Sequence, residues 1–154
     1  MSTTCVLCGT AAKQGACHDH LGFCQSCAMT LPSFEALLES LDSPAALLSR
    51  DLVILSENRR LRGITHYGGS TAVGAKIGLA LGCVHAARTE ECGRTDACAE
   101  CWLRRSVDLA RISGARIPGV PWDLLPHTGP RRPYAISAVK TREAVVVTLR
   151  PPAA

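Results

Sequence analysis

The chain of 154 residues has few aromatic side chains, with two each of tryptophan, tyrosine and phenylalanine, or 4% of all residues. Its apolar share of 47% is still large enough for a hydrophobic core, so that core must be aliphatic. The scarcity of aromatics also argues against binding of single-stranded nucleic acid, in which bases stack on aromatic side chains. Basic residues at 59, 60, 62, 104–105 and 131–132 are scattered and are typical of solvated helix faces.

Long hydrophobic runs are also missing. No apolar stretch approaches the roughly 18 residues that a membrane helix needs. Residues 1–5 have neither the basic nor the apolar region of a signal peptide. We therefore expect a cytoplasmic protein with no membrane partner. In a reducing compartment, clustered cysteines are more typical of metal sites than of disulfides.

The sequence also lacks a recognisable set of catalytic residues. The segment 68–76 is rich in glycine, but no Ser or Thr follows Lys76, so the pattern of a phosphate-binding loop is incomplete. There is no evident nucleophile–base pair and no zinc site with an open position. We expect that the protein is not an enzyme. A thiol oxidoreductase is the less favoured alternative, and it would use Cys17, the thiol outside the two sets described next.

What the chain has is cysteine: nine residues, eight of which form two separated sets of four. The first set has the spacing C-x2-C-x15-C-x2-C and the second C-x8-C-x5-C-x2-C, and their members are Cys5, Cys8, Cys24 and Cys27, then Cys83, Cys92, Cys98 and Cys101. Four thiolates can hold one metal ion or one small cluster. Two such sites would bring the formal charge of +4 close to zero, which weakens the case for a nucleic acid partner.

The first set predicts a zinc site, because two C-x-x-C pairs at this separation are a strong zinc signal. Between the pairs lie Cys17 and His20 at C-x-x-H spacing, which makes six candidate ligands, whereas one tetrahedral zinc needs four. Two interpretations remain open. His18 and Asp19 could complete a second site, or His18 and His20 could be exposed loop residues. Since so short a segment cannot bury a core, zinc would be structural and would supply most of the folding energy.

The stretch 17–27, Cys-His-Asp-His-Leu-Gly-Phe-Cys-Gln-Ser-Cys, resembles part of a B-box zinc finger, although the later ligands of that family are missing. The resemblance implies a zinc-finger-like module over residues 1–30. Residues 31–42 then predict a connecting helix, because Phe34, Leu37, Leu38 and Leu41 recur at helical spacing and Pro32 suits a first turn. Asp42-Ser43-Pro44 ends that helix.

The remaining residues, 43–154, predict an α+β domain. Short apolar runs at 45–49 and 52–56 read as a hairpin, Asn58 opens a short helical stretch, and strands are expected near 115–125, at 134–139 and at 144–149. The segment 48–58, Leu-Ser-Arg-Asp-Leu-Val-Ile-Leu-Ser-Glu-Asn, resembles the opening hairpin of a PAS domain. That resemblance implies a five-stranded antiparallel sheet with helices on one side.

The segments Leu81-Gly82-Cys83-Val84-His85-Ala86 and 91–104, which carry the second cysteine set, resemble a four-cysteine subgroup of PAS domains found in bacterial regulators. The resemblance implies a metal site near the sensory pocket. Zinc and an iron–sulfur cluster remain open, because thiolate ligation suits both. A helix expected over 97–113 would point its amide dipoles at the thiolates. His85 is either a further ligand or a packed or exposed histidine.

These features together predict a metal-binding regulatory protein that signals through protein–protein interaction, with a redox state or a gas as the sensed signal. It would bind a signalling or regulatory partner and itself, as a homodimer. The alternative is a non-sensing scaffold protein with two structural zinc sites. The second cysteine set is the better candidate for function, because its domain has a core of its own.

Overall fold

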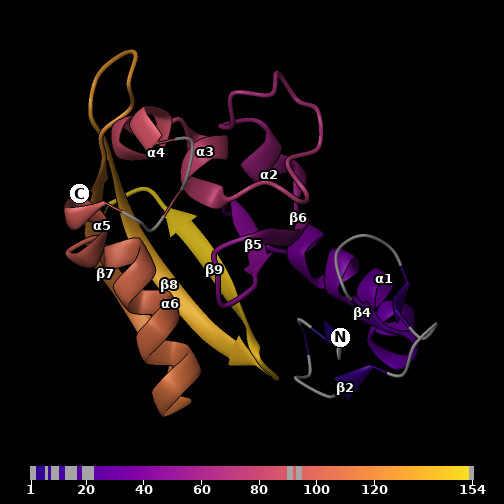
Figure 1. The fold of residues 1–154 in the computed structure, drawn as a ribbon. Coiled ribbons are helices and arrows are strands. Elements are labelled where there is room, and N and C mark those ends of the chain that lie inside the picture. The colour runs from indigo at the N-terminus through magenta and orange to yellow at the C-terminus, as the bar shows by residue number, and fades with distance from the viewer. Residues whose placement is uncertain are drawn as a thin grey trace.

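The computed structural model describes residues 3–5, 7, 11–12, 17–18, 23–89, 92 and 95–152. Its centre is a five-stranded antiparallel sheet in the order β6-β5-β9-β8-β7 (Figure 1). The strands are β5 (Ala45–Leu48), β6 (Ile54–Glu57), β7 (Ile117–Leu124), β8 (Arg132–Thr141) and β9 (Ala144–Arg150). The hairpin, the strand expected near 115–125 and the two closing strands are therefore confirmed, as is the five-stranded sheet that the PAS resemblance implied.

Short helices cover one face of this sheet. They are α2 (Arg59–Arg62), α3 (Ile77–Leu81), α4 (Val84–Thr89), α5 (Asp96–Ala99) and α6 (Trp102–Ser113). Alternate residues of the strands point at them, including Leu48, Ile136 and Val147, and meet Leu81 and Val107 in an aliphatic core. The expectation of one helix over 97–113 is wrong, because Cys101 has extended backbone (φ −69°, ψ 119°) and separates α5 from α6.

The helix α1 (Gln25–Glu39) packs on the opposite face of the sheet, beside β5 and β6 and away from α5 and α6 (Figure 1). A second buried cluster forms there, in which Leu38 meets Leu47, Leu55 and Ala144. The predicted connecting helix exists but begins earlier than residue 31, so that Pro32 lies inside it rather than at its first turn. The apolar residues at helical spacing predicted the helix. The first turn was missed because it overlaps the second C-x-x-C pair, which was assigned to the zinc module.

Asn58 connects the two sides of the molecule. It is 1% exposed, and its side-chain oxygen accepts hydrogen bonds from the amides of Ala45 (3.1 Å) and Leu61 (3.0 Å). Its side-chain nitrogen donates to the carbonyls of Leu38 (2.9 Å) and Ser43 (2.8 Å). The predicted role of Asn58 at the end of the strand and the start of α2 is confirmed, and the residue also holds the end of α1 against the sheet.

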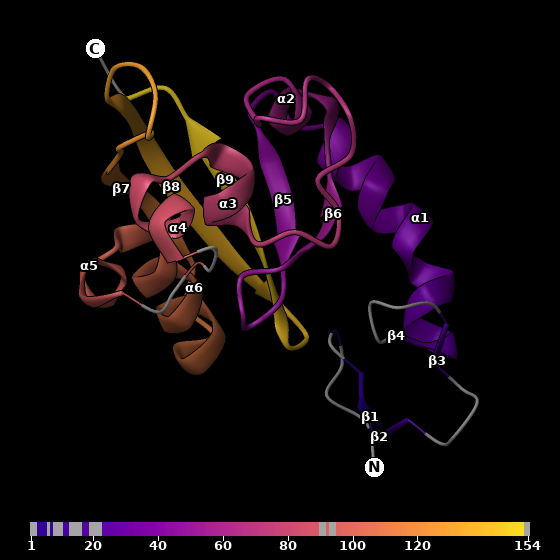
Figure 2. The same cartoon turned by 45° about the horizontal axis from the view of Figure 1, so that its top comes forward.

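Four two-residue strands precede α1: β1 (Thr3–Thr4) pairs with β2 (Ala11–Ala12), and β3 (Cys17–His18) pairs with β4 (Phe23–Cys24). Figure 2 shows these strands gathered near the first turns of α1. The segment touches the sheet through the β8–β9 turn, where the amide of Glu143 donates to the carbonyl of Leu7 at 2.7 Å. Within the described residues, no helix is both long and apolar enough to span a bilayer.

Candidate metal centre

The structure describes only part of the first cysteine set. Cys5 and Cys27 are buried in the α1-side cluster, with exposed fractions of 2% and 0%. The backbone of Cys24 ends β4, and its register partner on β3 is Cys17. Cys8 and His20 lie outside the described residues, as does Asp19, so a ligand set for this site stays a prediction.

All four cysteines of the second set are described, and they come from different places in the helical layer. Cys83 follows α3, Cys92 follows α4, Cys98 belongs to α5, and Cys101 directly precedes α6. They line one small cavity of about 40 Å³, together with Gly78, His85 and Trp122. The fold thus brings the four cysteines together with Leu52 and Trp122, which come from other parts of the sequence, next to the main core.

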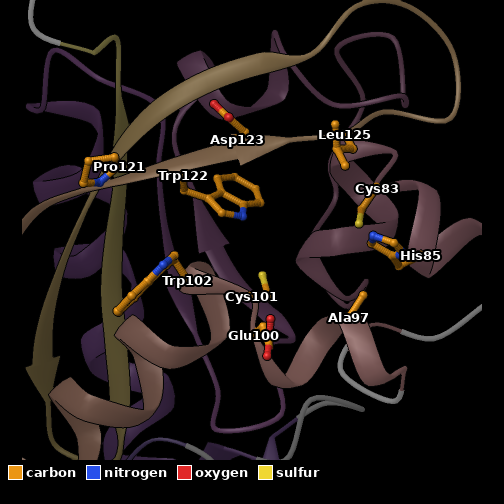
Figure 3. A pocket seen from close by; sticks show the side chains of 10 residues that line it. All are labelled: Cys83, His85, Ala97, Glu100, Cys101, Trp102, Pro121, Trp122, Asp123 and Leu125. Atoms are coloured by element: carbon orange, nitrogen blue, oxygen red, sulfur yellow. The ribbon is translucent and has the colours of Figure 1, made fainter.

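A larger cleft of about 360 Å³ lies between the start of α6 and strand β7, and Cys83, Cys101 and Trp122 line both the cavity and this cleft. Figure 3 shows Cys83 and His85 on one wall of this cleft and Trp102 on the opposite wall, with Cys101 and the ring of Trp122 between them. His85 therefore lines the site, and its role as a further ligand stays a prediction. Both tryptophans of the chain border the cleft, a feature that the sequence alone did not indicate.

Cys83 is positioned by a tight corner at Gly82. Gly82 ends α3 in the left-handed conformation (φ 76°), and a Cβ atom there would lie 1.5 Å from Nε2 of His66. The ring of His66 lies 5.1 Å from that of His127, whose amide donates to the carbonyl of Gly82 at 3.0 Å. This corner needs glycine for its backbone angle and for the close approach of His66.

Gly78 makes room for Cys92. A Cβ atom on Gly78 would stand 2.6 Å from the sulfur of Cys92 and 3.4 Å from the Cβ of Ala86. Glycine in the interior of a helix costs about 0.5–1 kcal/mol relative to alanine, so its presence in α3 calls for a local reason. Here the reason is that the sulfur of Cys92 packs against the backbone of α3, in the space that a side chain at position 78 would occupy.

Cys98 and Cys101 each have polar groups near the sulfur. Thr95 caps α5, and its hydroxyl donates to the sulfur of Cys98 at 3.1 Å. The backbone amides of Arg104 and Leu103, in the first turn of α6, partly offset the effect of burial on the pKa of Cys101 and so favour its thiolate. The side chain of Cys101 makes no capping hydrogen bond to α6. Donors around sulfur are typical of sites that hold thiolates, because they stabilise the negative charge.

Burial disfavours the thiolate form of these cysteines, because an apolar environment destabilises charge. Desolvation, with smaller contributions from the charges of the other three thiols, raises the pKa of Cys92 to about 11 against the opposing backbone amide of Gly78. Desolvation likewise raises the pKa of Cys101. Both residues are thiols rather than disulfides in this structure. Without a compensating positive charge, the site therefore favours protonated sulfur.

Positive charge is available beside Cys92. A polar cleft of about 540 Å³ is lined by Cys92 and by three cationic side chains, Arg50, Lys76 and Arg104, with one acid, Asp51. Lys76 also donates to the carbonyl of Cys92 at 3.4 Å. Four thiolates around a divalent ion carry a net charge of about −2. The cationic side chains that line the cleft beside Cys92 would help to stabilise that charge.

The donor set therefore fits a thiophilic metal in chemistry, burial and surrounding charge. As the side chains stand, however, no group of three or more His, Cys, Asp or Glu residues in the described part of the chain could hold a metal ion. The four sulfurs share a cavity without meeting at one point, and metal binding requires them to move closer together. Gly78, Thr95 and Trp122 are the site residues that sequence reasoning missed. Gly78 and Trp122 depend on contacts between separate segments, whereas Thr95 had a local signal as the cap of α5.

Comparisons with solved structures found similar folds. A domain of a sensory box sensor histidine kinase/response regulator from Geobacter sulfurreducens is 14% identical, with a TM-score of 0.48, over 80% of this chain and 96% of that one. The PAS domain of an HTR-like protein from Haloarcula marismortui is 18% identical, with a TM-score of 0.48, over 82% and 94%. A sensory box sensor histidine kinase from Vibrio cholerae is 17% identical, with a TM-score of 0.47, over the same shares.

No protein-family description matches the sequence, and comparison with curated proteins gives no match. At this level of structural similarity we draw nothing from what the three proteins do. The function is argued from the residues of this chain.

Proposed function

We propose that Cys83, Cys92, Cys98 and Cys101 bind one metal ion, and that this region is a regulatory module that acts by contacting another protein. The observation that carries the proposal is that these four thiols line one cavity, where Gly78 leaves room for the sulfur of Cys92. Four thiols in one small cavity are rare in a reducing compartment unless they bind metal. A PAS-like sensory role, as the sequence resemblance implied, is part of the same proposal.

Thiolate ligation suits both a single zinc ion and an iron–sulfur cluster. The first cysteine set has the spacing of a zinc site, which favours zinc for its neighbour as well. We therefore propose zinc at this site, with a second structural zinc held by the first cysteine set, drawn from Cys5, Cys8, Cys17, His20, Cys24 and Cys27.

The bound ion would supply the positive charge that lets buried sulfur exist as thiolate. The protein's own residues provide the rest. Gly78 leaves space for the sulfur of Cys92, Thr95 orients that of Cys98, and the first-turn amides of α6 face that of Cys101. Because Cys101 is the residue directly before α6, any change at its sulfur reaches this helix without an intermediary.

Cobalt(II) titration of the reduced full-length protein tests the metal proposal. We expect absorption bands of tetrahedral cobalt–thiolate, and we expect that Cys98→Ser and Cys101→Ser each weaken them while the far-ultraviolet circular dichroism stays native. Ser113→Ala, at the far end of α6, serves as the matched control and should leave the bands unchanged. Equal bands in wild type and both cysteine variants would rule out the second site.

Tryptophan fluorescence tests the regulatory part. Both tryptophans border the cleft, so the emission of the whole chain reports on this region. Removal and return of zinc should change the emission reversibly, together with amide hydrogen exchange in α6. If metal exchange leaves both signals unchanged, the scaffold alternative with purely structural zinc is the correct one.

A further inference from the structure

The polar cleft beside Cys92 carries an excess of positive charge. Its volume of about 540 Å³ is within the range of about 300–1,000 Å³ that is typical of small-molecule sites. Three cations, Arg50, Lys76 and Arg104, and one acid, Asp51, line it and give the lining a net charge of +2. Like charges gathered around one hollow repel each other, and an anion in the hollow would relieve that repulsion.

Two of these cations come from segments whose backbones are fastened together. Lys76 pairs with Val53 in an isolated antiparallel bridge, directly before α3. The amide of Ile77 then donates to the carbonyl of Leu52 at 2.9 Å. The β5–β6 turn, which contains Arg50, is therefore attached to the start of α3, and the two cations border the cleft from backbone that is held in place.

Leu52, in the wall of the same cleft, has a backbone conformation that leucine rarely adopts. Its φ of 66° is in the left-handed region, while its side chain is 4% exposed and belongs to the main core. Its amide donates to the carbonyl of Ser49 at 3.0 Å, and this hydrogen bond closes the turn around Arg50 and Asp51. Strained residues of this kind are concentrated at functional sites, where the surrounding structure holds them. The strain thus draws attention to the turn that carries Arg50.

Arg50 and Lys76 have few competing partners. Within the described part of the chain, Arg50 has no ion pair and no side-chain hydrogen bond. The Nζ atom of Lys76 makes one long contact, with the carbonyl of Cys92 at 3.4 Å. Arg104 is also engaged elsewhere, because its Nε pairs with Asp108 at 3.8 Å. Recognition of an anion would therefore depend mainly on Arg50 and Lys76, with Arg104 as a supporting charge.

We propose that this cleft binds the phosphate group of a small phosphorylated molecule. A guanidinium can donate two parallel hydrogen bonds to phosphate oxygens, and an ammonium adds a compact positive charge. A phosphate ester has a charge of about −1.5 to −2 at neutral pH, which matches the net charge of the lining. The site goes beyond the proposed function and does not depend on it. Cys92 borders both places, but the cations are not metal ligands.

Titration with glycerol 3-phosphate tests the site, followed by amide NMR of the reduced full-length protein at constant ionic strength. We expect saturable shifts at residues 50–53 and 76, and no shifts of comparable size in α1. Shifts that do not saturate, or that spread evenly over the chain, would overturn the proposal. Metal content, measured on each sample, reports separately on the cysteine site, so failure there does not count against the cleft.

Variants locate the binding. Arg50→Gln and Lys76→Gln remove one charge each with little loss of volume, and each should weaken glycerol 3-phosphate binding at least fivefold while the circular dichroism stays native. Arg60→Gln and Arg116→Gln are the matched controls, because these arginines are exposed and do not line the cleft. If the controls weaken binding as much, the general charge of the surface attracts the anion and the cleft is not the site.

Two further ligands identify the group that is recognised. Inorganic phosphate that binds as tightly as the ester supports recognition of the phosphate group alone, with free phosphate as its source. Tighter binding of the ester supports a phosphorylated small molecule whose remaining atoms also contact the cleft. Succinate carries two negative charges on separate carboxylates and should bind at least tenfold more weakly than either. Succinate binding as tight as that of phosphate would overturn the assignment to phosphate.

Discussion

The two cysteine sets differ in what surrounds them. Cys5 and Cys27 are buried in a packed apolar cluster between α1 and the sheet, where Leu38 and Leu47 are their neighbours. In the second set Cys98 is also buried, but Cys83, Cys92 and Cys101 are only partly buried, and all four border a cavity beside the main core. The first set is thus part of the packing that holds a short segment to the sheet. The second lies beside a core that exists without it.

This difference predicts that the first cysteine set contributes more to the stability of the fold than the second set does. A change at Cys27 must alter close packing, whereas a change at Cys101 alters a space that is already open toward a cleft. Substitutions at the second set should therefore cost the fold less than substitutions at the first. The following predictions test whether the two regions are as separate as their surroundings indicate.

The largest effect is expected from Asn58→Ala. The change removes four hydrogen bonds at once, including those to the buried amides of Ala45 and Leu61, so we expect the free energy of unfolding to fall by about 3 kcal/mol or more. Denaturant unfolding measures it, with exposed Arg60→Ala as the control. Hydrogen exchange should rise in α1 more than in α6, and equal rises in both helices would show that the two sides are not separable.

Gly82→Ala should lower the free energy of unfolding almost as much, because it disturbs the backbone next to Cys83 in the second cysteine set. The positive φ and the overlap with His66 together should cost about 2–3 kcal/mol in the free energy of unfolding. Gly114→Ala is the matched control, because it has a similar φ of 71° and no atom within 4 Å of the added Cβ. If both variants lose the same stability, close packing at the Cys83 corner is not what requires glycine.

Serine substitutions compare the two sets directly, in protein stripped of metal. Cys27→Ser shrinks a fully buried side chain that packs among apolar residues and whose sulfur accepts from Nη1 of Arg142 at 3.9 Å, and it should lower the free energy of unfolding by about 2 kcal/mol. Cys83→Ser, in a half-buried position on the cavity wall, should change it by about 0.5 kcal/mol or less. Equal losses in thermal or denaturant unfolding would contradict the contrast between the two sites.

Gly78→Ala should have the smallest effect on stability and a specific effect on metal. The added methyl group meets the sulfur of Cys92, while alanine favours the helix, so the two effects on the free energy of unfolding oppose each other. Zinc affinity, measured by competition with a chelator, should fall by about tenfold, as when a supporting contact of a ligand is lost. Gly63→Ala, at the end of α2, should leave the affinity unchanged.

The sheet could be predicted from the sequence because its strands are short apolar runs separated by polar turns, as at Arg50-Asp51. Asn58 was also readable, since a cap residue before a helical stretch has a local signature. The break at Cys101 was not, because helical periodicity continues through it and only the backbone angles reveal the end of α5. The start of α1 was hidden for a similar reason, within the second C-x-x-C pair.

For the candidate site, spacing grouped the four cysteines of the second set, and the structure places them around one cavity. The residues that shape this cavity could not be read from local patterns. Gly78 resembles any helix glycine until Cys92 lies against it, and Trp122 reaches the site from a strand that follows in the sequence. Contacts between distant segments are set by the packing of the whole domain, which a sequence window does not contain.

The most direct test is the metal-to-protein ratio of the anaerobically purified full-length chain and of its Cys98→Ser/Cys101→Ser variant, by elemental analysis. We predict that the double substitution removes one equivalent of zinc and leaves the metal of the first set in place. The same zinc content in both proteins, with native circular dichroism, would contradict the claim that Cys83, Cys92, Cys98 and Cys101 form a metal site.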